Sequence, residues 1–395
     1  MTIECPFLEH LTFSSLIAPI SEEEFRTSYW EKKPLVVHRQ CADYYGNLFT
    51  LSDFDEAVTR APSYIKTVDT TNKKGTVKQF ATVAGLEAVL ADMRNGASLI
   101  LEQLQRNEPK LGLLCRLLGQ ELGHTFETNL YLTAAHGKSS IPHWDNTDVF
   151  ILQVLGSKHW KIENERRIFP VRPFRMGTDV REFREGFCHF IVHRGDLIYI
   201  PRGFMHMAEC GSETSLHISL GLVPAVLEDF LHAIIKVAIQ RDERLRMALP
   251  LGFMRDGGED IAQCARAALL EAADASFLGN VLDLYRDELI KTHELDVSGQ
   301  IADHFQPVPL RLDDVVGPRR GVVWRMHVDQ DAVGLNVGTR RIAFPEFFRE
   351  SLDFSLNAPA YTIRDIPGEL EDQERIALVE RLMQEGLLIR KFVQQ

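Results

Sequence analysis

The sequence predicts an α+β protein in which an antiparallel β-sandwich or jelly roll is followed by a helical domain and a small mixed domain. Changes in hydrophobic periodicity support this prediction. From Phe126 to Val223, short apolar runs follow one another, separated by Gly, Pro and charged turns, as in all-β sandwiches. After Pro224 the apolar period becomes helical, and after residue 300 short strands return. The expected domains are residues 1–225, 226–300 and 301–395.

The composition is typical of a globular protein. A chain of 395 residues with 45% hydrophobic residues can bury the cores of two or three domains. We expect it in the cytoplasm and away from membranes, because no stretch approaches about 20 apolar residues and the N-terminus lacks a basic segment followed by an apolar run. Six scattered cysteines without a C-x-x-C pair predict reduced, mostly buried thiols. The net charge of −12 argues against direct nucleic-acid binding and favours a basic partner.

The region before residue 125 mixes short strands and helices. KPLVVHR at residues 33–39 predicts a strand, and LSDFDEAVTR at residues 51–60 predicts a helix with a serine cap. The polar insertion at residues 163–187 interrupts the sandwich, and we expect it to form a loop over one mouth. Six strands are expected in the sandwich: TNLYLT, VFILQVL, KHWKI, HFIVH, DLIYI and SLHISLGL.

The C-terminal half contains apolar stripes at helical spacing between Leu227 and Tyr285. These stripes fit either a bundle that packs on its own chain or a subunit interface. Beyond residue 300, short strands, a helix from Asp372 and a final strand predict a winged-helix-like domain. This domain has 12 Lys and Arg against 15 Asp and Glu residues, which argues against the DNA-binding use of that shape.

Three polar residues predict a metal site in the sandwich. His143 and Asp145 lie two residues apart, so in an extended segment their side chains point the same way. His206 follows a strand and a Pro-Arg-Gly turn, and a rolled sheet can bring it to the same mouth. Two imidazoles and one carboxylate are the ligands of non-haem Fe(II) oxygenases, although a catalytic zinc would accept them too. An H-x-D pair alone is common by chance, so the hypothesis depends on its setting.

Lys158 is the second anomaly, because it lies in an otherwise apolar strand. It shares strand parity with Trp160 and Ile162 and should therefore point to the same side as these large apolar residues. A lysine there is costly unless it is paired. An acidic ligand inside the sandwich would supply the pair, and a dicarboxylate that also chelates the metal fits best.

Two other strands have polar faces that could line the same cavity. Asn129 and Tyr131 share one face of their strand, and Ser215, His217 and Ser219 alternate with apolar neighbours. For Ser215 and His217, ordinary solvent-facing positions of an antiparallel sheet are an equally good interpretation.

These motifs, taken together, resemble those of the JmjC-type ribosomal oxygenases. WEKKPLVV at Trp30 resembles their N-terminal region, and the order of domains is similar along nearly the whole chain. The motifs that carry the resemblance are N-x-Y-L-T at Asn129, H-W-D at His143, D-V-F-I-L-Q-V-L-G-S-K-H-W at Asp148, G-D-L-I-Y-I-P-R-G-F-M-H at Gly195 and S-L-H-I-S-L at Ser215.

The resemblance implies a double-stranded β-helix of the cupin type, a JmjC domain, followed by a helical dimerisation domain and a winged-helix domain. It implies that Fe(II) is held by His143, Asp145 and His206, with 2-oxoglutarate and O2 as cosubstrates. It also implies a homodimer that hydroxylates a histidine or arginine side chain of a ribosomal protein. The residues expected to hold 2-oxoglutarate are Lys158, Asn129, Tyr131 and Ser219, with Lys158 on its distal carboxylate.

The segment AAHGKSS before Ile141 departs from the family pattern at the expected substrate entrance. The substrate therefore stays open between a basic peptide, another protein and a natural-product precursor. Two other functions are alternatives: N-methyl-lysine demethylation at the same iron centre, and a noncatalytic binding module. We further expect Trp144, Asp148 and Arg202, which neighbour the ligands, to shape the entrance.

Overall fold

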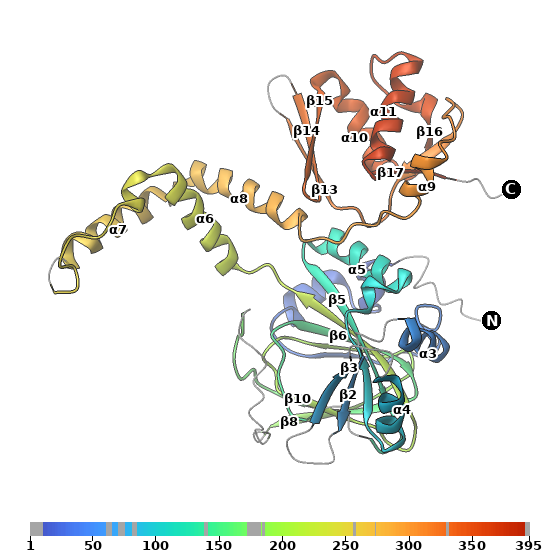
Figure 1. Cartoon of the computed structure of the whole chain (residues 1–395). Coiled ribbons are helices and arrows are strands. Elements are labelled where there is room, and N and C mark those ends of the chain that lie inside the picture. The colour runs from blue at the N-terminus through green and yellow to red at the C-terminus, as the bar shows by residue number, and fades with distance from the viewer. Residues whose placement is uncertain are drawn as a thin grey trace. The chain divides into compact units, whose positions relative to one another are not determined.

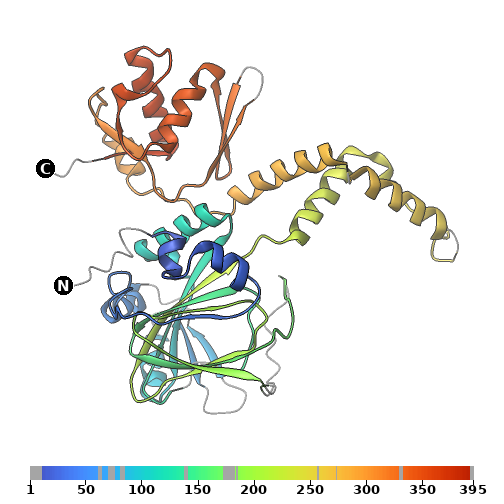
Figure 2. The same cartoon turned by 180° about the vertical axis from the view of Figure 1, so that it is seen from behind.

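The computed structural model of the chain is shown in Figures 1 and 2. It divides into two compact units, Met1–Pro224 and Ala225–Gln395. The expected division into three domains stays a prediction. The residues described are 11–60, 65–69, 76–80, 85–137, 141–171, 183, 186–255, 258–272, 274–328 and 332–391.

The first unit contains two antiparallel sheets. An eight-stranded sheet has the order β1-β9-β6-β11-β5-β4-β2-β3, and a three-stranded sheet has the order β10-β7-β8. From β6 to β11 the chain passes repeatedly between the sheets, since β6, β9 and β11 lie in the large sheet and β7, β8 and β10 in the small one, so the predicted jelly roll is confirmed. The strands are β1 (Leu35–Val37), β2 (Ile65–Asp69), β3 (Thr76–Phe80), β4 (Ser98–Leu101), β5 (Thr125–Thr133), β6 (Asp148–Leu155), β7 (Ser157–Glu163), β8 (Phe187–His193), β9 (Leu197–Ile200), β10 (His206–Glu209) and β11 (Ser215–Val223).

The outer face of the large sheet packs against helices. Leu216, Ile218 and Leu220 of β11 point to this face and join one core cluster with residues of the N-terminal helices and α5. This burial stabilises β11 in its position between β5 and β6. The helices of this unit are α1 (Phe13–Ile17), α2 (Glu22–Glu24), η2 (Phe25–Tyr29), α3 (Leu51–Arg60), α4 (Leu86–Arg94), η5 (Leu104–Arg106) and α5 (Pro109–Leu122).

The inner face of the large sheet faces the small sheet across a second, smaller core. Val149 and Ile151 of β6 and Ile198 of β9 pack there with Trp160 and Ile162 of β7. Side-chain alternation therefore gives β6 an apolar residue on both faces, which explains its continuous apolar run. The polar residues of β5 and β11 lie on this same inner face, since Ser219 pairs with both Ile151 and Asn129.

Two local predictions need correction. Helix α3 is present as predicted, but its cap is Thr50 rather than Ser52: the Thr50 N–H donates to Asp53 Oδ2 and the Asp53 N–H to Thr50 Oγ1. The cysteines are not uniformly reduced and buried, because Cys41 is disulfide-bonded and both Cys188 and Cys264 are exposed. Much of the predicted loop at 163–187 lies outside the described residues, as do residues 138–140 of AAHGKSS.

The second unit begins with helices that leave apolar side chains in solvent. On α6, Leu227, Leu231, Ile235 and Ile239 follow one another at four-residue spacing and are 39–71% exposed. Only Ile234, Ala272 and Val281 form a buried cluster among the described residues of these helices. The helices are α6 (Leu227–Arg241), η6 (Glu243–Arg246), α7 (Gly258–Ala272), α8 (Ala275–Ile290) and α9 (Gln300–Phe305).

The rest of this unit has its own core between two three-stranded sheets and two helices. Arg325 on β13 ties it to α8 through Asp283 and Asp287. No helix among the described residues is both long and apolar enough to cross a bilayer. The remaining elements are β12 (Val315–Pro318), β13 (Trp324–Val328), β14 (Ala332–Val337), β15 (Arg340–Pro345), η7 (Glu346–Phe348), α10 (Arg349–Asn357), β16 (Tyr361–Thr362), η8 (Ile363–Asp365), α11 (Asp372–Gln384) and β17 (Leu388–Arg390).

Candidate metal centre

The structure brings His143, Asp145 and His206 together. One ligand atom from each lies within 4.8 Å of the others. Nε2 of His206 is 3.5 Å from Asp145 Oδ2, and Nε2 of His143 is 3.9 Å from Asp145 Oδ1. The two rings are tilted by 54°, with centroids 4.4 Å apart. Two nitrogen atoms and a carboxylate therefore converge on one point, which is the donor set predicted for an iron or zinc site.

The other ring nitrogen of each histidine is held by the backbone. Nδ1 of His143 lies 2.8 Å from the Ile141 carbonyl oxygen, and Nδ1 of His206 lies 3.0 Å from that of Phe204. A carbonyl can only accept, so each Nδ1 donates and each Nε2 keeps its lone pair free for a metal. Burial and the nearby His143 also lower the pKa of His206 to about 4. The neutral imidazole that a metal requires is thus the favoured form.

Backbone pairing fixes the distance between the ligand segments. The N–H of each histidine donates to the carbonyl of the other, over 3.1 Å from His143 and 2.8 Å from His206. The Gly203 N–H also donates to the Asp145 carbonyl over 3.0 Å. Gly203 has a φ of +81°, and a Cβ there would lie 1.7 Å from the Ile168 carbonyl oxygen, so only glycine fits this turn.

Lys158 lies on β7 of the small sheet, points toward the polar inner face of the large sheet and is fully buried. Its Nζ donates to Thr133 Oγ1 at 3.3 Å and lies 3.2 Å from His217 Nδ1. Within the part of the chain that the structure describes, no carboxylate forms an ion pair with it. Burial lowers the pKa of Lys158 to about 7, with the neighbouring Cys210 acting weakly in the opposite direction. The predicted inward orientation of Lys158 is confirmed.

His217 and Thr133 complete the surroundings of Lys158. His217 is buried, stacks on Tyr131 at 4.8 Å and meets the edge of Trp160 at 5.6 Å. The solvent-facing interpretation of Ser215 and His217 is therefore wrong, since both are buried. Thr133 was not singled out from the sequence, although its parity with Asn129 and Tyr131 on β5 could have identified it.

Asn129 and Ser219 lie opposite each other on β5 and β11, closer to the apolar half of the inner face. Asn129 Oδ1 accepts a hydrogen bond from the Gln103 N–H at 3.0 Å. Because that contact occupies the amide oxygen, the Nδ2 group is left to donate to a ligand. Three of the four residues predicted to hold a cosubstrate, Asn129, Tyr131 and Ser219, share this face with Thr133, Ser215 and His217. The fourth, Lys158, lies on the opposite sheet.

Trp144, Asp148 and Arg202 are buried. Their expected role in shaping an entrance stays a prediction. Asp148 accepts a hydrogen bond from Tyr199, and Arg202 forms an ion pair with Glu31. Both polar groups therefore have partners within the protein.

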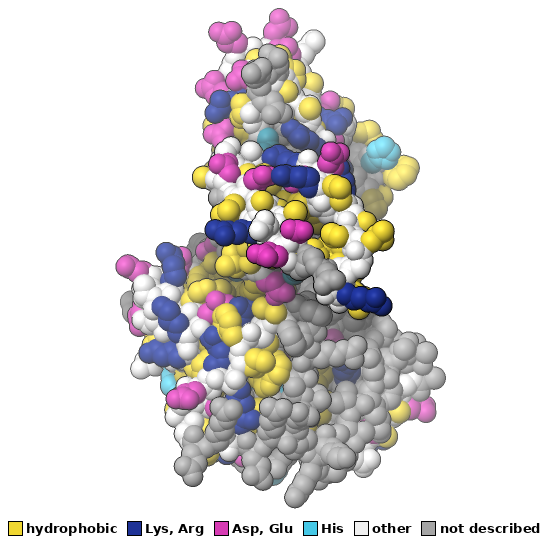
Figure 3. Space-filling model, turned by 90° about the vertical axis from the view of Figure 1, so that its left-hand side faces the viewer, with side chains coloured by type: hydrophobic (Ala, Val, Ile, Leu, Met, Phe, Trp, Pro, Cys, Tyr) yellow, Lys and Arg dark blue, Asp and Glu magenta, His cyan; other side chains and the backbone are white. Residues whose placement is uncertain are grey.

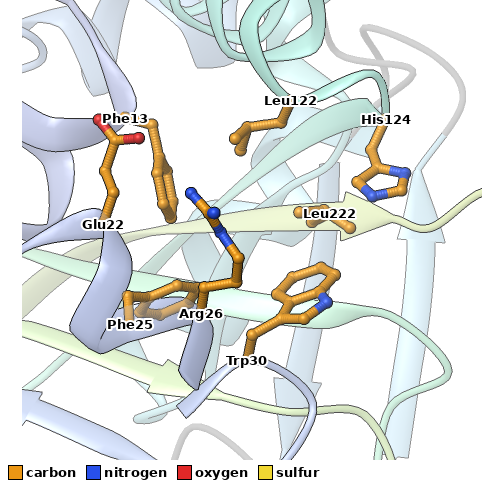
Figure 4. A pocket seen from close by; sticks show the side chains of 8 residues that line it. All are labelled: Phe13, Glu22, Phe25, Arg26, Trp30, Leu122, His124 and Leu222. Atoms are coloured by element: carbon orange, nitrogen blue, oxygen red, sulfur yellow. The ribbon is translucent and has the colours of Figure 1, made fainter. Parts of the chain in front are cut away.

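A separate pocket of about 200 Å³ lies on the outer face of the large sheet. Figure 4 shows Phe13, Phe25 and Trp30 forming its walls with Arg26 at its edge. Leu222 also lines it, and this residue has the opposite strand parity to Ser219 and His217. The pocket is therefore separated from the metal centre by the sheet.

Comparison with known proteins finds a family match over the region that contains the candidate metal ligands and Lys158. A family model described as a JmjC domain matches residues 101–230. Ribosomal oxygenase 1 of Gallus gallus is 31% identical over 274 residues, which are 66% of this chain and 46% of that protein. Ribosomal oxygenase 2 of Rattus norvegicus is 32% identical over 223 residues, covering 53% of this chain and 46% of that one. The chain thus spans somewhat less than half the length of these relatives.

A solved structure agrees over nearly the whole chain. The ribosomal oxygenase YcfD of Escherichia coli, in complex with cobalt and 2-oxoglutarate, superposes with a TM-score of 0.57. The match covers 95% of this chain and 99% of that one at 19% sequence identity. At this identity the likeness shows a shared fold.

Lys158 predicts an unusual dependence of stability on pH. Its folded-state pKa of about 7 lies below the ordinary value of 10.5. The unfolded chain therefore binds one more proton than the folded chain between these two values, and stability should rise with pH across this window. In Lys158→Met this rise should be lost, as measured by urea unfolding at several pH values. Lys161→Met, on the outer face of the same strand, should keep the wild-type profile; an unchanged profile in Lys158→Met would contradict the assignment.

Proposed function

We propose that this chain, which carries a JmjC domain over residues 101–230 and is similar in sequence to ribosomal oxygenases, is an Fe(II)- and 2-oxoglutarate-dependent dioxygenase. One observation carries the proposal: three metal-binding side chains and a buried lysine without an acid partner face one interior, in the described residues. The first group suits a divalent metal, and the second suits a dicarboxylate.

His143, Asp145 and His206 would hold the metal. The fit is supported by the free Nε2 atoms and by the carbonyls that fix both rings. Three protein ligands leave other coordination positions for 2-oxoglutarate and O2. When bound, iron and 2-oxoglutarate supply the oxidising power to insert an oxygen atom into a C–H bond.

Lys158 would hold the distal carboxylate of 2-oxoglutarate. A carboxylate beside its Nζ would favour the ammonium form and raise the lysine pKa from its depressed value. Thr133 and His217 already fix the Nζ position. The lysine side chain would therefore lose little conformational entropy when the carboxylate binds. Asn129, Tyr131 and Ser219 would contact the remainder of the cosubstrate.

The apolar half of the inner face has a different role. Val149, Ile151 and Ile198, together with Trp160 and Phe204, make that side of the interior predominantly apolar among the described residues. Such walls exclude water from a bound substrate and hold the target carbon close to the metal. The chain's contribution is therefore placement and desolvation, with little acid–base chemistry.

The proposed substrate is a basic segment of a ribosomal protein, hydroxylated on a histidine or arginine side chain. The names of the relatives and the net charge of −12 support this class. On the face shown in Figure 3, basic and acidic side chains are interspersed, so recognition there would depend on local contacts rather than on a uniform acidic field. N-methyl-lysine demethylation is the second candidate, because a Caenorhabditis elegans relative at 28% identity is named a bifunctional lysine-specific demethylase and histidyl-hydroxylase.

We also propose that the chain forms a homodimer through the helices that follow residue 225. The apolar side chains on α6 are too exposed to be explained by packing within the unit. A second copy would cover such a stripe in a symmetric, self-complementary contact.

The first prediction of this function concerns the metal ligands. His143→Ala, Asp145→Ala and His206→Ala should each weaken Co(II) binding by more than about 100-fold, because each removes one of three protein ligands. Titration followed by the cobalt absorption bands measures this directly. His159→Ala, an exposed histidine on the outer face of β7, is the matched control and should bind like the wild type. Wild-type affinity in any ligand variant would remove that residue from the assignment.

The second prediction concerns the cosubstrate. Lys158→Ala should raise the 2-oxoglutarate concentration needed for succinate formation by about 100-fold or more, because breaking a buried ion pair typically costs about 3–5 kcal/mol. Cobalt affinity should change far less. An unchanged 2-oxoglutarate requirement would mean that a group other than Lys158 binds the carboxylate.

The third prediction concerns the substrate. Basic peptides from ribosomal proteins should gain the mass of one oxygen atom, whereas free amino acids should react poorly because they lack the binding energy of flanking residues. Mass spectrometry of ribosomal proteins from cells with and without this protein identifies the target.

Loss of a methyl group from an N-methyl-lysine peptide would support demethylation instead. Faster turnover of a small molecule would replace the protein-hydroxylase proposal, and absence of succinate in all cases would leave a noncatalytic binding module.

The fourth prediction concerns assembly. Light scattering at micromolar concentration should give twice the chain mass of 44.9 kDa. Ile235→Glu should yield monomers, because it places a charge in the proposed apolar contact. Gln240→Glu adds the same charge on the same helix outside the stripe and should remain dimeric. A wild-type monomer would refute the assembly.

A further inference from the structure

We propose that Arg202 is a positioning residue for the metal centre, acting through a buried network with Glu31, Asp148 and Tyr199 that holds the turn leading to His206. The inference rests on the proposed function, because it concerns the same metal site. The network joins three segments that are distant in sequence: the WEKKP turn, the start of β6, and the Pro-Arg-Gly turn after β9.

Arg202 is the centre of this network. Its side chain is 3% exposed, and its guanidinium donates to Glu31 Oε1 at 2.5 Å. Its backbone N–H lies 3.4 Å from Asp148 Oδ1, and the guanidinium carbon lies 4.3 Å from the centre of the Phe169 ring. A buried arginine is tolerated only where its charge is paired and its plane is packed. Its position is therefore fixed by partners from other parts of the chain.

Glu31 enters the network in a strained conformation. Its φ is +50°, in the left-handed region that residues with a Cβ avoid. Three of its groups are engaged: the N–H donates to the Tyr199 hydroxyl at 3.0 Å, the carbonyl accepts from Arg166, and the carboxylate pairs with Arg202. Strain at a residue that is held by several partners is typical of functional sites.

Tyr199 and Asp148 link this turn to β6. The Tyr199 hydroxyl donates to Asp148 Oδ1 at 2.8 Å while accepting from Glu31, so both of its hydrogen-bonding roles are used. Asp148 is fully buried, and its Oδ2 atom has no hydrogen-bond partner among the described residues. Burial raises the pKa of Asp148 to about 6, against the opposing effects of Tyr199 and Arg202. Tyr199 and Arg202 thus favour the ionised form of Asp148, whereas burial disfavours it.

The network connects to the ligands through the residue after Arg202. Gly203 donates to the Asp145 carbonyl, and the chain reaches His206 three residues later, where it pairs with His143. A shift of Arg202 would move one end of this short segment, and with it both the Asp145 backbone and the His206 ring. Phe204 would shift too, and its carbonyl holds His206 Nδ1.

A purely stabilising role is the rival explanation, and Arg39 provides the control for it. Arg39 is another arginine of the first unit that ties distant segments together, donating to the Tyr45 hydroxyl and to the carbonyls of Gly195 and Leu16. These contacts do not involve the Pro201–His206 turn. If Arg202, like Arg39, only stabilises the fold, Arg39→Met and Arg202→Met should behave alike.

The test measures Co(II) affinity of the full chain by its absorption bands, at a temperature where circular dichroism shows each variant folded. We expect Arg202→Met and Glu31→Gln to weaken cobalt binding by about 10–100-fold, the usual effect of losing a residue that orients metal ligands. Arg202→Lys, which keeps the charge opposite Glu31, should recover part of the affinity. Arg39→Met should lower the melting temperature while keeping cobalt affinity within about twofold of the wild type.

The outcomes separate this inference from the proposed function. If the wild type binds no cobalt, the proposed metal site itself fails. If the wild type binds and Arg202→Met and Glu31→Gln bind equally well, the positioning role is overturned and the network only stabilises the fold. Should Arg202→Met not fold, Glu31→Gln decides alone, because it is nearly isosteric and its side chain is 28% exposed.

Discussion

The metal centre depends on one short antiparallel bridge, in which the backbones of His143 and His206 exchange two hydrogen bonds. This bridge places ligands 63 positions apart in the chain at a fixed separation before any metal binds. Hydrogen bonds from the same backbone then orient the rings, since Ile141 and Phe204 supply the carbonyls that hold each Nδ1. The backbone thus determines both the spacing of the ligands and the tautomer of the imidazoles.

The interior around this bridge is divided by chemistry. Residues of β6 and β9 make one half apolar, whereas β5 and β11 supply hydroxyl, amide and imidazole groups to the other half. The division follows from the two-residue period of strands, because the same strands bury apolar residues on their outer faces. The Lys158 side chain points from the small sheet toward the polar half, where its Nζ atom contacts Thr133 and His217.

Buried charged groups whose hydrogen-bonding partners are neutral or incomplete, in the described part of the chain, are the common feature of the site and its support. Lys158 has only neutral partners, and Asp148 has one oxygen atom with none. Such groups are expensive in an apolar interior and persist where binding or positioning requires them. Lys158 faces the proposed cosubstrate, whereas Asp148 belongs to the network with Tyr199 and Arg202.

The sequence by itself determined the strands, the jelly roll and the candidate ligands, because strand period, turn residues and the H-x-D spacing are local patterns. The inward orientation of Lys158 followed from parity alone. Only the tertiary structure decided that His217 is buried against Lys158, and that Arg202 pairs with Glu31. These contacts join segments far apart in the chain. Local periodicity can assign a side chain to a face, but the packing of the two sheets and the WEKKP turn decides which groups meet there.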